Sequence, residues 1–214
     1  MISEEYIIEN HCKELCPFYE ETLECNSSKR CPYYKLLFKE NEENKEFWLV
    51  DKKRNLIELN NNFQSNDIIG ITIRKYKTTN RFICMSLNQL SNDYQWSTDL
   101  ETDIRTTLDD PIENLKIMSK LSPSLDLFPA EQICPDDSFL GSSVDYQSIQ
   151  VNIDKIKNII ERYRLKSNIN FSNIFWTSST GYDRYICGLR LDRNVVNCCY
   201  NKDGSCSVLP MFLI

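Results

Sequence analysis

Four cysteines near the start of the chain have the residue type and the close spacing of a metal site. Cys12, Cys16, Cys25 and Cys31 are separated by three, eight and five intervening residues. Four thiolates satisfy the tetrahedral geometry of a structural zinc site. Each half of the cluster ends in Cys-Pro-aromatic-Tyr, and a proline after a cysteine favours the turn of a compact chelating knuckle. We therefore expect zinc to bind at these four residues.

The same thiols also fit other chemistry. An iron–sulfur cluster uses the same ligands, and the cysteines could equally remain free or form disulfides. The spacing contains no Cys-x-x-Cys pair, so these alternatives stay open. His11 is the only histidine of the chain, and we expect it to be a bystander rather than a ligand. A metal would stabilise a segment that is too short to fold on its own.

A second group of cysteines lies near the end of the chain, at Cys187, Cys198, Cys199 and Cys206. A nucleophilic cysteine needs a neighbouring base or a positive field, and the chain has no second histidine to act as that base. We expect these cysteines to be small, partly buried apolar side chains. A Ser-His-Asp triad is excluded because the single histidine precedes the folded domain. The sequence therefore predicts a protein that is not an enzyme.

Acidic residues gather in the middle of the chain and raise the question of calcium. They are Asp99, Glu101, Asp103, Asp109 and Asp110. A calcium site needs several oxygen ligands that converge within one loop region. The chain contains no Glu-Pro-Asn, Gln-Pro-Asp or Trp-Asn-Asp triplet. We expect a solvated acidic loop and predict no calcium.

Composition limits the partners. The chain has 214 residues, 41% of them hydrophobic, and a net charge of -6. This charge argues against an extended nucleic-acid surface, which needs clustered lysine and arginine. No apolar run approaches the roughly 20 residues that cross a bilayer, so no membrane association is predicted. If Met1 is the natural start, its acidic surroundings are unlike a signal peptide and a cytoplasmic location is expected.

The chain divides at a polar, charged run over residues 40–46, which we interpret as a linker. Residues 1–45 then form a Cys-rich module, and residues 46–214 form the main domain. Apolar runs at 47–50 and 56–59 flank a polar turn and predict a hairpin. The β-branched run at 68–73 predicts a buried strand, paired with a second strand at 81–87.

The rest of the domain mixes helices and strands. Residues 88–138 look rich in loops, with one helix at 111–121, and residues 148–165 form the clearest amphipathic helix. Closing strands are expected at 174–176, 185–191, 195–199 and 207–212. We interpret the aromatic residues Trp96, Phe175 and Trp176 as core. The pattern is that of an α+β domain.

Several short motifs follow one another in a recognisable order along this domain. They are the aromatic hairpin, Ile69-Gly70-Ile71, a strand that runs into Gln95-Trp96-Ser97-Thr98, Asn114, the turn Leu140-Gly141-Ser142-Ser143, the helix with Ile153 and Ile156, Phe175-Trp176-Thr177-Ser178-Ser179-Thr180, and Val208-Leu209-Pro210. In this order residues 46–214 resemble the bacterial C-type-lectin-like domain related to the legionella collagen-like protein C-terminal domain. The variable proteins of diversity-generating retroelements share that fold. The resemblance implies a C-type-lectin-like fold.

The resemblance also implies a ligand-facing surface in the C-terminal hairpins. The positions that it marks are Thr180, Tyr182, Asp183, Arg184, Asn197, Tyr200, Asn201 and Lys202. Tyrosine offers rigid amphipathic area, while asparagine, aspartate, arginine and lysine offer hydrogen bonds and charge. We expect a non-catalytic protein that recognises a protein or another macromolecule through these loops.

Two other functions are weighed against recognition. In the first, the Cys-rich module binds zinc and the lectin-like domain only supports it. In the second, the chain resembles the formylglycine-generating enzymes, which share the broad fold and use a cysteine pair near the C-terminus. Cys199 and Cys206 are separated by six residues, which does not reproduce that pair.

Overall fold

The structure is a computed structural model of the whole chain, and it describes most of residues 47–214. The described residues are 47–59, 63–76, 79–101, 104–107, 109–180, 186–192, 195–200 and 202–214; at 91–93 and 195–200 only the backbone is described. These residues form a mixed α+β fold with two β-sheets. The Cys-rich module, including Cys12, Cys16, Cys25 and Cys31, lies outside the described residues.

The first sheet has six strands in the order β2-β1-β3-β4-β11-β6. β1 (Trp48–Asp51) and β2 (Leu56–Glu58) form the predicted antiparallel hairpin. The short 3-10 turn η2 (Ser65–Asp67) leads into β3 (Ile68–Lys75), which pairs antiparallel with β4 (Phe82–Ser86). Both predicted strand pairs are therefore confirmed.

Gly70 shows why the centre of this sheet needs a small residue. A Cβ atom at Gly70 would lie 2.6 Å from the backbone oxygen of Met85 and 2.6 Å from the ring of Phe212. Neither group can withdraw cheaply, because one is backbone of the neighbouring strand and the other is a buried aromatic ring. The glycine lets the two strands and the ring pack closely.

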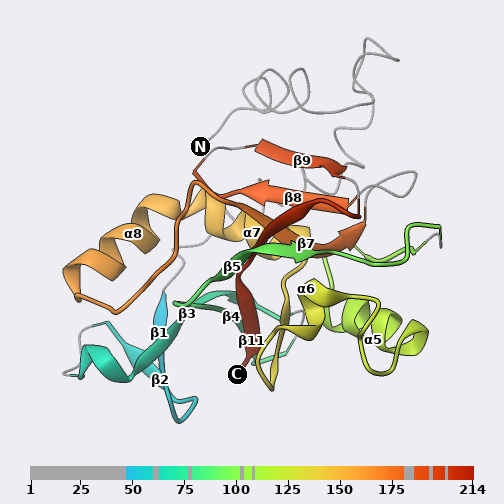
Figure 1. The fold of residues 1–214 in the computed structure, drawn as a ribbon. Helices are drawn as coiled ribbons and strands as arrows, with labels where there is room; N and C mark the ends of the chain where they lie inside the picture. The colour runs from blue at the N-terminus through green and yellow to red at the C-terminus, as the bar shows by residue number, and fades with distance from the viewer. Residues whose placement is uncertain are drawn as a thin grey trace, which may run out of the picture.

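The second sheet has five strands in the order β5-β10-β7-β8-β9. β5 (Leu90–Gln95) is the strand that runs into the Gln95-Trp96 element, and the other four strands come from the C-terminal part of the chain. Their bounds are β7 (Ile174–Thr180), β8 (Ile186–Arg190), β9 (Val195–Tyr200) and β10 (Ser205–Val208). β9 is the last strand of this sheet (Figure 1).

The end of the chain passes from one sheet to the other. β10 pairs with β5 and β7 in the second sheet, whereas β11 (Pro210–Leu213) lies between β4 and β6 (Ser138–Leu140) in the first. The prediction of one closing strand over 207–212 is therefore wrong. Buried Leu209 is the crossing point, and its carbonyl accepts a hydrogen bond of 3.0 Å from the hydroxyl of Tyr146.

The helix α5 (Pro111–Leu121) has the predicted bounds. Asp110 caps it by accepting from the amides of Ile112 and Glu113, and Pro111 takes the first turn, where its missing N–H costs nothing. A short helix, α6 (Pro129–Gln132), follows in the region that was expected to be rich in loops.

The single helix predicted over 148–165 is two helices, so that prediction is wrong in its extent. α7 (Ser143–Val151) begins earlier, at a capping box formed by Ser142 and Asp145, and α8 (Ile153–Arg162) follows Asn152. The side-chain amide of Asn152 donates to the carbonyl of Ser148 at 3.0 Å, which stabilises the break between the helices. α7 packs against β3 of the first sheet and against β7 and β8 of the second (Figure 1).

The aromatic core predicted from the sequence is confirmed. Trp96, Phe175 and Trp176 are at most 1% exposed. The indole of Trp176 donates to the carbonyl of Tyr94 at 2.6 Å, and Trp96 makes an edge-on contact with Phe128. Within the described residues, no helix is long and apolar enough to cross a membrane.

Candidate functional site

Strand register brings the ends of three strands to one place in the second sheet. Thr180, the last residue of β7, pairs with Ile186, the first residue of β8, and Ile186 pairs with Tyr200, the last residue of β9. The two described residues that flank the segment 181–185 therefore lie at the same end of the sheet as Tyr200. We call the end of the sheet marked by Thr180, Ile186 and Tyr200 the hairpin end.

The predicted ligand-facing residues differ in how much the structure says about them. Tyr182, Asp183, Arg184 and Asn201 lie outside the described residues. Asn197 and Tyr200 lie on β9, where only the backbone is described; Asn197 pairs with Gly188, further from the hairpin end than Tyr200. Thr180 and Lys202 are fully described.

Thr180 is buried rather than exposed, with 8% of its surface accessible. Its hydroxyl accepts from the amide of Thr106 at 3.0 Å, and its own amide donates to the hydroxyl of Thr106 at 2.8 Å. The Thr106 hydroxyl donates in turn to the carbonyl of Ser178 at 2.8 Å. The expectation of an exposed Thr180 is corrected, because its hydroxyl is used to fix the end of β7.

Lys202 is also buried, with 4% of its surface accessible. Its ammonium donates to the carbonyl of Asp99 at 3.3 Å, and its own carbonyl accepts from the amides of Trp96 and Ser97. These contacts attach Lys202, which precedes β10, to the segment that follows β5. The expectation that Lys202 is exposed is corrected for this reason.

The hydroxyl side chains of β7 point into the protein. Thr177, Ser178 and Ser179 have no accessible surface. The Thr177 hydroxyl donates to the carbonyl of Cys187 at 2.8 Å, and the Ser178 hydroxyl accepts from the side-chain amide of Asn114 at 2.9 Å. The Ser179 hydroxyl accepts from the amide of Ser143 at 2.9 Å. This strand is therefore bonded to β8, α5 and α7 at successive residues.

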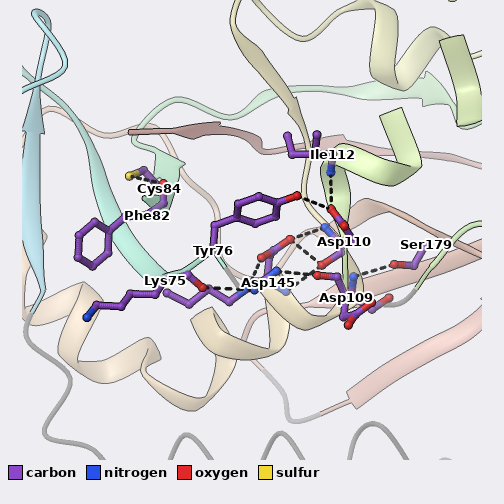
Figure 2. Close-up of polar contacts among 12 residues, drawn as sticks. Lys75, Tyr76, Phe82, Cys84, Asp109, Asp110, Ile112, Asp145 and Ser179 are labelled. Carbon is purple, nitrogen blue, oxygen red and sulfur yellow. Dashed lines mark hydrogen bonds and ion pairs between the residues drawn. The ribbon is translucent and has the colours of Figure 1, made fainter. Parts of the chain in front are cut away.

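A partly buried ion pair connects the first sheet to the start of α7 (Figure 2). The guanidinium of Arg74 pairs with the carboxylate of Asp145 at 2.5 Å and donates to the carbonyl of Asp109 at 2.8 Å. The second carboxylate oxygen of Asp145 accepts from both the amide and the hydroxyl of Ser142 at 2.6 Å. A buried carboxylate is tolerated because a charge partner and several donors replace its water.

Two of the acidic residues weighed as calcium ligands, Asp99 and Asp110, make hydrogen bonds within the protein. Asp110 accepts from the Tyr76 hydroxyl at 3.0 Å in addition to capping α5 (Figure 2). Asp99 accepts from the amide of Glu101 at 3.0 Å. Asp103 lies outside the described residues. In the described ranges no group of three potential metal-binding side chains comes together.

The described rear cysteines are buried thiols. Cys187 and Cys206 are at most 6% exposed. Burial raises the pKa of the Cys206 thiol to about 12, so almost none of it is the reactive thiolate at neutral pH. Cys199, which the enzyme hypothesis would pair with Cys206, lies on β9, where side chains are not described.

Thr106, which fixes the hairpin end, and Arg74, which pairs with Asp145, were not found from the sequence. Thr106 lies in a stretch without periodicity, and its partners Ser178 and Thr180 are more than seventy positions away, at separations of 72 and 74. Arg74 follows the β-branched run at 68–73, and a charged residue at the end of such a run is usually solvated. No local signal marks either residue, since both roles depend on contacts that only the tertiary fold creates.

Comparison with known proteins yields no match to a family model, to a curated protein or to a solved structure.

Proposed function

We propose that this protein is a non-catalytic recognition protein that binds a protein or another macromolecule at the hairpin end of the second sheet. The observation that carries the proposal is the register of Thr180, Ile186 and Tyr200. It brings the strand ends on either side of the segment 181–185 and the end of β9 to one end of the sheet. Rigid scaffolds that present adjacent loops are a common arrangement for binding.

The hydrogen bonds around β7 support this proposal. A loop binds with a smaller entropy cost when its ends are already fixed. Thr180 is fixed by Thr106, and the backbone of Lys202 is fixed by Trp96 and Ser97. Thr180 and Lys202 therefore serve as anchors in the proposal, and the contacts to the ligand are assigned to their neighbours.

The ligand contacts are assigned to Tyr182, Asp183, Arg184, Tyr200 and Asn201, with Asn197 at the margin. Tyrosine and arginine are enriched among residues that dominate binding energy. The two-sheet architecture and the order of motifs along the chain support a C-type-lectin-like scaffold for this surface. That scaffold is part of the proposal.

The proposal is tested by capture from a cell lysate with the full chain as bait. Partners are compared between wild type, the variant Tyr182→Ala/Arg184→Ala/Tyr200→Ala and the control Glu113→Ala/Lys116→Ala, whose two side chains are exposed on α5. We expect specific partners to be lost with the triple variant and kept with the control. Equal recovery with all three baits would contradict the proposal.

A second proposal concerns the Cys-rich module, where Cys12, Cys16, Cys25 and Cys31 would bind one structural zinc ion. The residue types and their clustering in a short segment favour it. Elemental analysis of the full chain, purified under reducing conditions, tests it against the variant Cys12→Ser/Cys16→Ser. One zinc per chain that disappears in the variant is expected; iron in its place, or no stoichiometric metal, would overturn the zinc assignment.

A further inference from the structure

Glu131 on α6 is a buried acid with very few polar contacts. Only 3% of its surface is accessible. Both of its carboxylate oxygens face the same donor, the amide of Leu140, at 3.1 Å and 3.3 Å. Within the described residues no lysine or arginine pairs with it. Asp145, another buried acid, has an arginine and a serine as partners.

A carboxylate in such a place is unstable as an ion. Removing the charge from water is costly, and one amide donor returns only a small part of that cost. Desolvation by burial accordingly raises the pKa of Glu131 to about 7, although the bond from the Leu140 amide acts in the opposite direction. The carboxyl is therefore divided between its neutral and charged forms near neutral pH.

Two groups near Glu131, Cys134 and Tyr146, stay neutral in this range. Cys134 and Tyr146 are electrostatically coupled to it, and burial raises the pKa of both groups well above their usual values. β6, β7 and β11 contribute no charged residue. The charged residues of α5 (Glu113, Lys116, Lys120) are exposed, and on β5 Tyr94 is half-buried and the side chain of Asp93 is not described. Of the three groups Glu131, Cys134 and Tyr146, Glu131 is the one that titrates near neutrality.

Its single hydrogen bond lies at a junction of the fold. Leu140 ends β6, the next carbonyl (Gly141) accepts from the amide of Ser178 on β7 at 2.8 Å, and Ser142 caps α7. The contact between Glu131 and Leu140 therefore joins α6 to the segment that follows β6. That segment is hydrogen-bonded to β7 and leads into α7. Loss of this contact would remove the hydrogen bond that α6 makes to the end of β6.

We propose that Glu131 is a pH-responsive latch that holds α6 against β6 while its carboxyl is protonated and releases it when the carboxyl ionises. Protonated, the carboxyl is neutral and one oxygen still accepts from Leu140. Ionised, it is stabilised by water, which it reaches only when α6 moves away. The proton passes to solvent, and opening is favoured as the pH rises.

Amide hydrogen exchange of the full chain tests the latch. With a closed-state pKa of about 7 and an ordinary value of 4.5 in the open state, linkage predicts that the opening constant of β6 rises roughly 30-fold between pH 5.5 and pH 8. Exchange rates of Phe139 and Leu140, corrected for intrinsic exchange, report that constant. We expect the rise in wild type and in the control Glu113→Gln, and a change below about threefold in Glu131→Gln.

A rise of equal size in Glu131→Gln would overturn the proposal, as would a flat profile in wild type. If Glu131→Gln does not fold, carboxyl-carbon NMR of the wild-type protein decides the matter. A midpoint near 7 for Glu131, accompanied by the exchange profile above, supports the latch. A midpoint near 4.5 overturns it.

Discussion

Thr106 and Thr180 bind each other through two reciprocal hydrogen bonds: each backbone amide donates to the other residue's hydroxyl, at 3.0 Å and 2.8 Å. The pair joins the segment before α5 to the last residue of β7. It fixes the point at which the chain leaves the sheet toward the proposed ligand-binding residues. A residue expected to contact the ligand is instead part of the frame that positions its neighbours.

The first prediction concerns this pair. Thr106→Val keeps the shape of the side chain but removes the hydroxyl that serves the Thr180 amide and the Ser178 carbonyl. Leaving such groups unsatisfied should lower the free energy of unfolding by about 1–3 kcal/mol. Urea denaturation measures this loss. Ser119→Ala, on the half-buried side of α5, is the control and should change stability by less than about 0.5 kcal/mol. Equal stability of the two variants would contradict the structural role of Thr106.

The second prediction concerns the ion pair between Arg74 and Asp145. Arg74→Met leaves the Asp145 carboxylate buried without its charge partner, so we expect a loss of about 3–5 kcal/mol in unfolding free energy. The double variant Arg74→Met/Asp145→Asn should be less destabilised than the sum of the two single variants, by about 1–3 kcal/mol.

Lys52→Met serves as the matched control for Arg74→Met. Lys52 pairs with Asp67 at 3.1 Å, but both side chains are more than half exposed. An exposed pair contributes little, so the control should lose less than about 1 kcal/mol. Additive effects of the Arg74 and Asp145 substitutions would show that the two groups do not interact as described.

The third prediction is a pH dependence of global stability set by Glu131. Its pKa is higher in the folded protein, about 7, than the ordinary value of 4.5. Between these values the folded chain binds more protons than the unfolded chain, so the free energy of unfolding falls as the pH rises. Between pH 5 and pH 8 the fall should be roughly 2–3 kcal/mol larger in wild type than in Glu131→Gln.

Two other carboxyls have shifts of the opposite sign. Side-chain hydrogen bonds from Asn55 and Ser122 lower the pKa of Asp51 and Asp126, respectively. Their contribution to the free energy of unfolding is lost as the pH falls below the ordinary pKa of an aspartate. This loss therefore lies outside the window from pH 5 to pH 8. Equal pH profiles of wild type and Glu131→Gln in that window would show that Glu131 titrates normally.

Much of the fold could be predicted from local patterns. The helix at 111–121 was found because its periodic apolar residues follow a proline at the first turn. The two strand pairs of the first sheet were found because apolar runs flank polar turns. The core positions of Trp96, Phe175 and Trp176 follow from their size and surroundings.

The failures share one cause, which is burial created by distant parts of the chain. All residues of α7 from Ser143 to Gln150 are buried, polar ones included, so the helix has no apolar stripe to reveal its start. The closing strand was predicted as one piece because residues 207–212 are apolar almost throughout, although the chain changes sheets at Leu209. In the sequence, Thr180 and Lys202 have residue types that are common on surfaces. In the fold they are buried, and they bond to Thr106 and Asp99, respectively.

The central claim is recognition at the hairpin end, and the dissociation constant of a captured partner tests it most directly. Titration calorimetry compares wild type, Tyr182→Ala/Arg184→Ala/Tyr200→Ala and the control Glu113→Ala/Lys116→Ala. The account predicts that the triple variant binds at least about tenfold more weakly, as expected when residues that dominate binding are removed, while the control matches wild type. An unchanged dissociation constant in a folded triple variant would contradict it.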